Sequence, residues 1–386
     1  MSVFRGADYQ RVLSRYKGCV SHFPGSMLYN RTRQHGSFSR MRGLKGRGKL
    51  QWHWRRNRNS RSIVDDRNII FIVGAGRSGT TWLHMMLGAH PEVATGQESQ
   101  LFEKYLRRLD DQWQREMNYP DTEELRRHGI TSYIDEEKFT RLLRDFAVGV
   151  FENVLTAKPG ATVFLEKSPN NSFNIDLMAR CFPEAKYIHV IRDGRDVVTS
   201  VLAARKSWGR QWATRHAADA ASEWQRAVTE SARLESLVTS YAEVRYEDLL
   251  ASGQSELDRL FDFLGLPVDD GFVNETFERF SFKKLQKNQY DRDVFLNTGV
   301  ATASGTSGRA EPKGFFRKGV AGDWKNSLTK NQLCEIYWVA GEALESLGYA
   351  TDRGEASEKP PWSIRRRGIA GEIRKGVRKL GRKLLS

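Results

Sequence analysis

The sequence predicts an α/β fold, in which helices flank a doubly wound and mostly parallel sheet. Residues 69–73 are five apolar, mostly β-branched residues, a pattern typical of a strand buried on both faces. A glycine-rich loop and a helical apolar pattern follow them. Two further apolar runs, residues 162–166 and 187–191, end in loops that carry the cations Lys167 and Arg192. This repeated order of strand, polar loop and helix indicates right-handed crossovers between parallel strands.

The loop after the first predicted strand is suited to bind an anion. Gly74, Gly76 and Gly79 permit positive φ angles and a close approach of the backbone. A helix that begins at Thr80 collects backbone N–H groups at its N-terminus, where they attract a phosphate or sulfate. The spacing Gly74-x4-Gly79 matches a P-loop, but Thr80 stands where a P-loop has lysine, and the nearest cation is Arg77. An ordinary glycine-rich turn is the alternative; Arg77 and the paired threonine hydroxyls favour anion binding.

The apolar pattern predicts the remaining elements. We expect a short strand at residues 93–95, then a loop with Glu98, then a largely helical insertion over residues 101–160 that covers the site. The C-terminal half is predicted to contain, in order, one long helix over residues 214–241, a short strand from Ala242 that leads into a helix capped by Asp248, a helix over residues 257–264, a mobile loop over residues 297–308 and a final helix over residues 331–347.

Charge divides the chain into three predicted parts. Residues 1–67 contain sixteen Lys or Arg and three Asp or Glu without sustained periodicity, which indicates a basic, irregular extension. Residues 68–350 form the predicted folded domain. Residues 351–386 are predicted as a linker and a basic amphipathic tail, with nine cations after residue 362. The two tails suit an anionic membrane surface, and we expect no specific binding of nucleic acid.

The cysteines indicate a reducing compartment. Cys19, Cys181 and Cys334 are odd in number and widely spaced, so they form neither a disulfide framework nor a metal site. We expect no metal ion, no signal peptide and no membrane-spanning segment. The expected location is therefore the cytoplasm, with a peripheral position at a membrane surface left open.

Four blocks in the predicted domain together resemble the sulfotransferases that use 3′-phosphoadenylyl sulfate (PAPS). The blocks are residues 77–82 (Arg-Ser-Gly-Thr-Thr-Trp), residues 192–200 (Arg-Asp-Gly-Arg-Asp-Val-Val-Thr-Ser), residues 246–248 with 281–284 (Tyr-Glu-Asp and Ser-Phe-Lys-Lys) and residues 317–326 (Arg-Lys-Gly-Val-Ala-Gly-Asp-Trp-Lys-Asn). The resemblance covers residues 68–350 and implies a P-loop NTPase-like sulfotransferase core with PAPS as co-substrate and no metal.

The resemblance also implies which residues hold the co-substrate. PAPS carries a 5′-phosphosulfate and a 3′-phosphate, so its binding requires two anion sites with the adenosine between them. The implied partners are Gly76, Arg77, Ser78, Gly79, Thr80 and Thr81 for the phosphosulfate, Trp82, Tyr246 and Phe282 for the purine, and Arg192, Ser200, Arg317, Lys318 and Gly319 for the 3′-phosphate.

The implied reaction is an in-line transfer of the sulfuryl group to a hydroxyl or amine. Negative charge then develops on the bridging oxygen, where preorganised cations lower the barrier. Arg77 and Lys167 are the predicted catalytic cations, with Ser168 or Ser78 assisting.

The general base follows from the same resemblance. Cytosolic members carry a histidine in a Lys-Thr-His-x-Pro stretch, where this chain has Glu-Lys-Ser-Pro at residues 166–169. The front half is instead similar to the tyrosylprotein branch, whose catalytic loop glutamate is matched by Glu98 in Gly-Gln-Glu. We predict Glu98 as the base, with Glu166 as second and Glu103 as third candidate.

Other functions remain open at this point. A nucleotide phosphotransferase or triphosphatase of the same core fold would need a lysine after Gly79 and a carboxylate for Mg²⁺ at a strand end. A non-enzymatic binding protein with a degenerate core is a third possibility. For a sulfotransferase, the acceptor can be a saccharide, a tyrosyl peptide, a lipid or a small molecule. Residues 99–160 and 283–312 are predicted to shape its pocket.

Overall fold

The computed structural model describes residues 64–119, 129–287, 294–296, 311–351 and 361. All of them belong to one of the two compact units of the chain, residues 59–386. The basic N-terminal extension, the predicted mobile loop over residues 297–308 and the amphipathic C-terminal tail lie outside the described residues. These three predictions, and the boundaries of the three parts, stay predictions.

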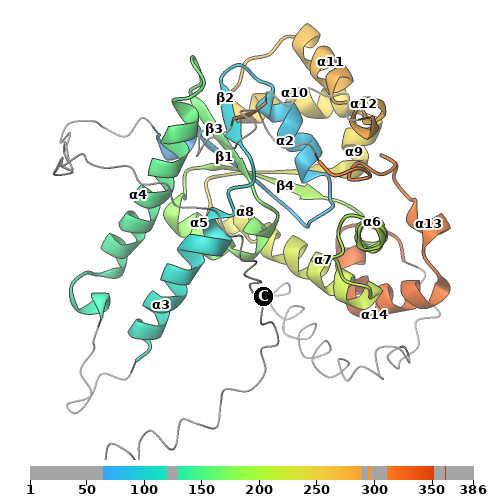
Figure 1. Cartoon of the computed structure of the whole chain (residues 1–386), viewed down its shortest axis with the longest axis horizontal. Coiled ribbons are helices and arrows are strands. Elements are labelled where there is room, and N and C mark those ends of the chain that lie inside the picture. Colours follow the sequence, from blue (N-terminus) through green and yellow to red (C-terminus); the bar gives the residue numbers. More distant parts are fainter. Residues whose placement is uncertain (1–63, 120–128, 288–293, 297–310, 352–360, 362–386) are drawn as a thin grey trace, which may run out of the picture. The chain divides into compact units, whose positions relative to one another are not determined.

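The centre of the described part is a six-stranded sheet (Figure 1). The strands are β1 (Ile69–Val73), β2 (Val93–Gly96), β3 (Val163–Lys167), β4 (Lys186–Ile191), β5 (Ser240–Arg245) and β6 (Phe295–Leu296). They lie in the order β5-β4-β1-β3-β2-β6, and every neighbouring pair is parallel. The predicted parallel α/β sheet is confirmed, with β1 and its glycine loop near the middle.

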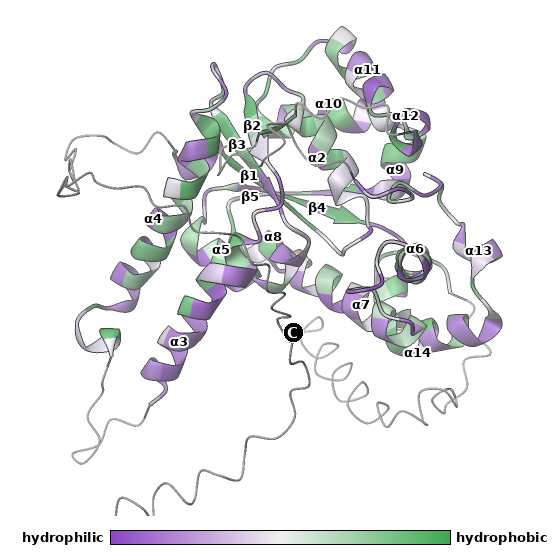
Figure 2. Ribbon diagram, viewed as in Figure 1, coloured by the Kyte–Doolittle hydropathy of each residue, from purple (hydrophilic) through white to green (hydrophobic). Residues whose placement is uncertain are grey.

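Helices cover both faces of this sheet, as a doubly wound fold requires. Ile70 and Ile72 of β1 pack into one core with α2 (Thr80–Gly88) and α10 (Gly253–Leu264). Ile69 and Phe71 point the other way, into a second core with α4 (Glu136–Leu155) and α5 (Ile175–Cys181). The strand is apolar at every position because neither face meets water. Figure 2 shows the apolar residues concentrated in the sheet and on the inner sides of the helices, whereas α3 is largely hydrophilic.

A third core lies beside the site, between α6 (Gly194–Lys206), α7 (Ala217–Ala232) and α14 (Lys330–Ser346). The other helices are α3 (Arg107–Met117), α4 (Glu136–Leu155), α5 (Ile175–Cys181), α8 (Leu234–Leu237), α9 (Tyr246–Ala251), α11 (Asp270–Arg279), α12 (Phe282–Gln286) and α13 (Trp324–Ser327). Short turns of helix are η1 (Asp66–Asn68), η2 (Phe102–Leu106), η3 (Ile130–Ser132) and η4 (Pro169–Phe173). The predicted helical insertion is confirmed by η2, α3 and α4.

Two local predictions were wrong. The helix expected over residues 214–241 ends at Ala232, and the short α8 and strand β5 follow. Leu234 continues the helical spacing but is buried in a different core, and β5 pairs with β4, so tertiary pairing overrides the local pattern. Asp248 is not a helix cap, because α9 already begins at Tyr246 after the extended Arg245.

Candidate active site

The glycine loop has the backbone geometry of an anion site. Gly74 has a φ of 143°, and a Cβ there would lie 2.4 Å from the carbonyl oxygen of Val190. Gly79 has a φ of 98°, and a Cβ there would lie 2.5 Å from the ring of Tyr246. Helix α2 begins at Thr80 without a side-chain cap, so its first N–H groups are available to a ligand.

Most of the predicted co-substrate residues line one cavity. Its wall consists of Arg77, Gly79, Thr80, Thr81, Trp82, Arg192, Ser200, Tyr246, Phe282 and residues 315–320, which include Arg317, Lys318 and Gly319. Gly76 lines a neighbouring cavity instead. Ser78 is fully buried, and its hydroxyl has no hydrogen-bond partner among the described residues. The structure therefore brings together residues as far apart in the sequence as Arg77 and Val320.

Three aromatic rings form one wall of this co-substrate cavity. The ring centroids of Trp82 and Phe282 are 4.8 Å apart, and those of Trp82 and Tyr246 are 5.9 Å apart. Trp82 is anchored by its indole N–H, which donates to the carbonyl of Phe280 at 2.9 Å. Trp82 and Tyr246 are almost fully buried and belong to the core, so only a small part of each side chain faces the cavity.

Arg192 is held at the end of β4 with part of its guanidinium left unpaired. Its terminal nitrogens donate to the backbone oxygens of Arg77 (3.2 Å) and Val320 (3.3 Å), and it lies 3.9 Å from the ring centroid of Tyr246. Its Nε is buried and has no partner among the described residues. A buried cationic donor without an acceptor indicates that an anion completes the site.

Arg77 connects the glycine loop to Ser200, one of the residues predicted to bind the 3′-phosphate. Its Nε donates to the Ser200 hydroxyl at 3.2 Å, and a terminal nitrogen donates to the carbonyl of Phe315 at 2.6 Å. The guanidinium stacks on the rings of Phe315 (4.2 Å) and Trp208 (5.1 Å). Burial, and next the charge of Arg192, lower the pKa of Arg77 to about 10, so it remains a cation at neutral pH.

Lys167 and Glu98 form an ion pair beside the loop. The Lys167 side chain is 2% exposed and the Glu98 side chain 35% exposed. The Lys167 ammonium also donates to the Thr81 hydroxyl at 3.1 Å, which places the positive charge at the first turn of α2. Of the three residues predicted as catalytic, Arg77 therefore lies in the glycine loop and Lys167 and Glu98 lie beside it, with Glu98 the more exposed member of the pair.

A second cavity, with a volume of about 510 Å³, adjoins the first one. Arg77, Thr80 and Thr81 line both cavities. Its other lining residues include Glu98 and Gln100 and an aromatic group, Phe173, Trp208, Trp212, Trp224 and Phe315. Because Glu98 faces this space next to the anion loop, we refer to it as the acceptor cavity.

The other two carboxylates considered as a base are placed differently. Glu166 is buried, and its oxygens accept from Ser99 (2.8 Å), Ser168 (2.6 Å) and Asn171. Burial raises the pKa of Glu166, although these hydrogen bonds oppose the shift. Glu166 thereby ties the loop that carries Glu98 to the end of β3. Neither Glu166 nor Glu103, which lies in η2, lines the two cavities.

The sequence did not reveal several residues of the site. Phe315, Trp208 and Trp212 come from loops in which nothing but the aromatic residue type marks them. Glu311 interacts electrostatically with Lys167, Glu98 and Arg77; burial raises its pKa, and Lys167 opposes that shift. Of the ranges predicted to shape the acceptor pocket, only Gln100 is among the lining residues that the structure describes; most of the wall comes from residues 169–227.

Two absences apply to the described residues alone. No group of three or more His, Cys, Asp and Glu side chains there is arranged to hold a metal ion. No helix within them is both long and apolar enough to cross a membrane. The expected absence of a metal stays a prediction.

Comparison with known proteins decides the family. The model of a family described as "Sulfotransferase family" matches residues 69–270, just over half of the chain. The chain belongs to the sulfotransferase family. The matched region of this sulfotransferase contains the glycine loop, Lys167, Arg192 and Tyr246.

Curated relatives of this sulfotransferase are named as protein-tyrosine sulfotransferases. It is 29% identical over 218 residues to protein-tyrosine sulfotransferase 1 of Danio rerio, which covers 54% of this chain and 56% of that protein. It is 29% identical over 203 residues to protein-tyrosine sulfotransferase A of Caenorhabditis elegans, covering 52% and 50%. The chain spans about half the length of these two relatives. A putative protein-tyrosine sulfotransferase of Caenorhabditis briggsae is 27% identical over 300 residues, covering 77% and 92%.

Solved structures with some likeness are also sulfotransferases. The sulfotransferase domain from the curacin biosynthetic pathway aligns with a TM-score of 0.46 at 20% identity, covering 73% of this chain and 98% of that chain. A mouse sulfotransferase complexed with PAP aligns with a TM-score of 0.44 at 15% identity, covering 73% and 83%.

Proposed function

We propose that this protein transfers the sulfuryl group of PAPS to a hydroxyl of an acceptor. The observation that supports it most is the co-substrate cavity, which is lined by the uncapped start of α2 and by the four cations Arg77, Arg192, Arg317 and Lys318. The rings of Trp82, Tyr246 and Phe282 line the same cavity. Several cations beside aromatic rings suit a nucleotide with phosphates on both its 3′ and 5′ sides, and the Nε of Arg192, which has no partner among the described residues, supplies a donor for one of them.

The proposed mechanism uses the groups that surround the glycine loop. The acceptor oxygen attacks sulfur in line, the bond between sulfur and the bridging phosphate oxygen breaks, and adenosine 3′,5′-bisphosphate leaves. Glu98 accepts the proton of the attacking hydroxyl. Arg77 and Lys167, with the N–H groups of α2, stabilise the charge that develops on the bridging oxygen. The Ser168 hydroxyl donates to Glu166, so it supports the loop geometry rather than the leaving group.

For the acceptor, we propose a tyrosyl side chain of a peptide. The curated relatives carry names that state tyrosine as their acceptor. The acceptor cavity supports this choice, because Trp208, Phe315 and Phe173 can pack against a phenol ring while Glu98 lies at its hydroxyl. Saccharide, lipid and small-molecule acceptors are the alternatives to test. The cytoplasmic location and a membrane surface as partner of the basic tails stay predictions.

A phosphotransferase reaction is less well supported. Thr80 stands at the position of the lysine that such enzymes use, and the cations at the loop are Arg77 and, from the end of β3, Lys167.

The test is transfer of radioactive sulfur from labelled PAPS by the purified full chain. A tyrosyl peptide is compared with the same peptide carrying phenylalanine, and calorimetric titrations compare adenosine 3′,5′-bisphosphate with ATP and 5′-AMP. We expect label on the tyrosyl peptide alone and a clear preference for the bisphosphate. Preference for the bisphosphate without labelling of the peptide would refute the tyrosyl acceptor and leave the proposed sulfuryl donor in place. If ATP binds as tightly as the bisphosphate and its phosphate is released, the assignment of PAPS as the donor is refuted.

A further inference from the structure

We propose that Asp196 is a positioning residue that sets the 3′-phosphate site by holding the loop of residues 317–324 against helix α6. This inference rests on the proposed function. The loop carries Arg317, Lys318 and Gly319, whereas α6 and the residues just before it carry Arg192 and Ser200. Neither element alone provides a complete set of partners for a phosphate.

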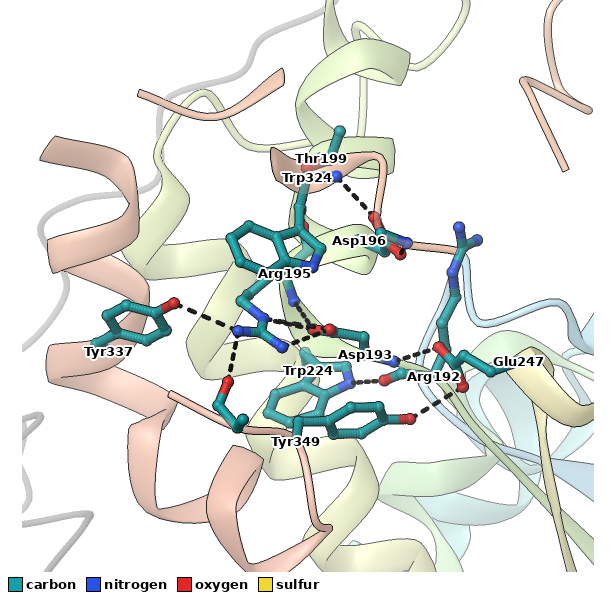
Figure 3. A network of polar contacts seen from close by, with 12 residues as sticks. Arg192, Asp193, Arg195, Asp196, Thr199, Trp224, Glu247, Trp324, Tyr337 and Tyr349 are labelled. Atoms are coloured by element: carbon teal, nitrogen blue, oxygen red, sulfur yellow. Dashed lines mark hydrogen bonds and ion pairs between the residues drawn. The ribbon is translucent and has the colours of Figure 1, made fainter. Parts of the chain in front are cut away.

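The Asp196 carboxylate accepts hydrogen bonds from two backbone amides of this loop (Figure 3). One oxygen accepts the N–H of Gly322 at 2.7 Å, and the other accepts the N–H of Trp324 at 2.9 Å. Asp196 is completely buried in the first turn of α6. A carboxylate can accept at both oxygens, whereas an amide has only one acceptor oxygen, so the position discriminates sharply between Asp and Asn.

Asp323, the residue between Gly322 and Trp324, links these backbone contacts to the two loop cations. The Asp323 carboxylate is buried and accepts from Arg317 and Lys318, each at 2.6 Å. Burial raises the pKa of Asp323, but the hydrogen bonds from Lys318 and Arg317 outweigh it and lower the pKa to about 2. Asp196 therefore fixes the backbone on both sides of the carboxylate that orients the two loop cations.

A second contact supports the same clamp. The Arg195 guanidinium stacks on the Trp324 ring at 4.0 Å from its centroid, and it is itself held by Asp193 and by the carbonyl of Ala350. Figure 3 shows Arg195 and Asp196 reaching the loop from the same turn of α6. Two consecutive side chains thus attach the loop, one through backbone hydrogen bonds and one through ring stacking.

This arrangement predicts a selective effect on the 3′-phosphate. Partners that are preorganised bind an anion more tightly, because no ordering cost remains at the moment of binding. Loosening the loop should weaken contacts of Arg317 and Lys318 with the 3′-phosphate. It should have little effect on the 5′ site at the start of α2, because the backbone hydrogen bonds of Asp196 go to Gly322 and Trp324 and not to the glycine loop.

The experiment is calorimetric titration of the full-length wild type and Asp196→Asn with adenosine 3′,5′-bisphosphate and with 5′-AMP. We expect the variant to bind the bisphosphate about tenfold more weakly and 5′-AMP within about twofold of wild type. Asp269→Asn is the matched control, because Asp269 also accepts a backbone N–H, that of Phe272, at the exposed start of α11. The control should change neither affinity.

Other outcomes would overturn the inference. Equal weakening of both nucleotides, or no change, would show that Asp196 has no selective role. If Asp196→Asn does not fold, Trp324→Leu takes its place, because it removes the ring stacking at a half-buried position and is expected to shift the same ratio of affinities. A wild type without preference for the bisphosphate would refute the proposed function instead.

Discussion

Replacing Glu98 by glutamine tests the catalytic assignment most directly. Glutamine keeps the shape of the side chain but cannot accept the proton of the acceptor hydroxyl. Loss of a general base typically lowers turnover by about 10²–10⁴-fold, which corresponds to about 3–5 kcal/mol in the activation free energy. We therefore expect kcat to fall by this factor, whereas the affinity for adenosine 3′,5′-bisphosphate stays unchanged because Glu98 does not line the co-substrate cavity.

The same substitution should also lower stability, by a predictable amount. Lys167 is 2% exposed and would lose its carboxylate partner. Breaking a fully buried pair costs about 3–5 kcal/mol, and an exposed pair is worth about 0–1 kcal/mol. Since Glu98 is one-third exposed, we expect an intermediate cost of about 1–3 kcal/mol, visible as a lower melting temperature in calorimetry.

Single-turnover transfer of labelled sulfur, measured beside nucleotide titrations, separates these effects. Glu103→Gln is the matched control, because Glu103 is a nearby carboxylate that lines neither cavity and should leave turnover unchanged. Full turnover in Glu98→Gln would refute its role as base. A parallel loss of bisphosphate affinity would show that Glu98 acts by shaping the co-substrate cavity.

Three further predictions concern the two cavities. Gly319→Ala should lower the affinity for the bisphosphate about tenfold or more, measured by calorimetry. The reason is that Gly319 has a φ of 65° and that a Cβ there would lie 2.2 Å from the Phe282 ring. An unchanged affinity would contradict this loop geometry. Trp212→Ala should raise the KM for the acceptor about tenfold without changing the affinity for the bisphosphate. Trp212 lines the acceptor cavity but not the co-substrate cavity, and it is 54% exposed. Steady-state kinetics with varied acceptor concentration measure this KM. The pKa of Asp323 is lowered to about 2, so its contribution to stability is present above its unfolded pKa of about 3.9 and is lost as pH falls towards 2. Melting curves of wild type and Asp323→Asn should therefore converge between pH about 4 and 2; a constant difference would contradict this.

The central part of the fold was predictable because its signals are local. Residues 69–73 are apolar at every position, and Gly74 and Gly79 after them are required by positive φ angles and by close contacts, with the Val190 backbone and the Tyr246 ring respectively. The bounds of the strands predicted over residues 162–166 and 187–191 differ by at most one residue from those of β3 and β4. Most predicted co-substrate residues meet in one cavity, because they stand at the carboxyl ends of parallel strands or in blocks with distinct residue spacing.

What was not predictable depends on contacts between distant segments. The spacing of Leu234 continues a helical pattern, and only pairing with β4 makes the following residues a strand. Asp196 stands in a motif recognised from sequence, but its partners are backbone amides 126 and 128 positions away. Trp212 lies in a loop with no periodic pattern, so its place at the acceptor cavity follows from the packing of that loop.

In the proposed sulfuryl transfer, Lys167 takes the place of the missing P-loop lysine. Strand β3 is the parallel neighbour of β1, so its carboxyl end lies beside the glycine loop, and the Lys167 ammonium reaches the Thr81 hydroxyl. In triphosphatases a carboxylate at a strand end helps to hold Mg²⁺ beside the phosphates. Here the strand end presents a buried cation of the chain itself, and the adjacent Glu166 has its oxygens bound by Ser99, Ser168 and Asn171. The Lys167 ammonium contacts both Thr81 of the first turn of α2 and Glu98, which is where the proposed reaction would place the bridging oxygen and the attacking hydroxyl.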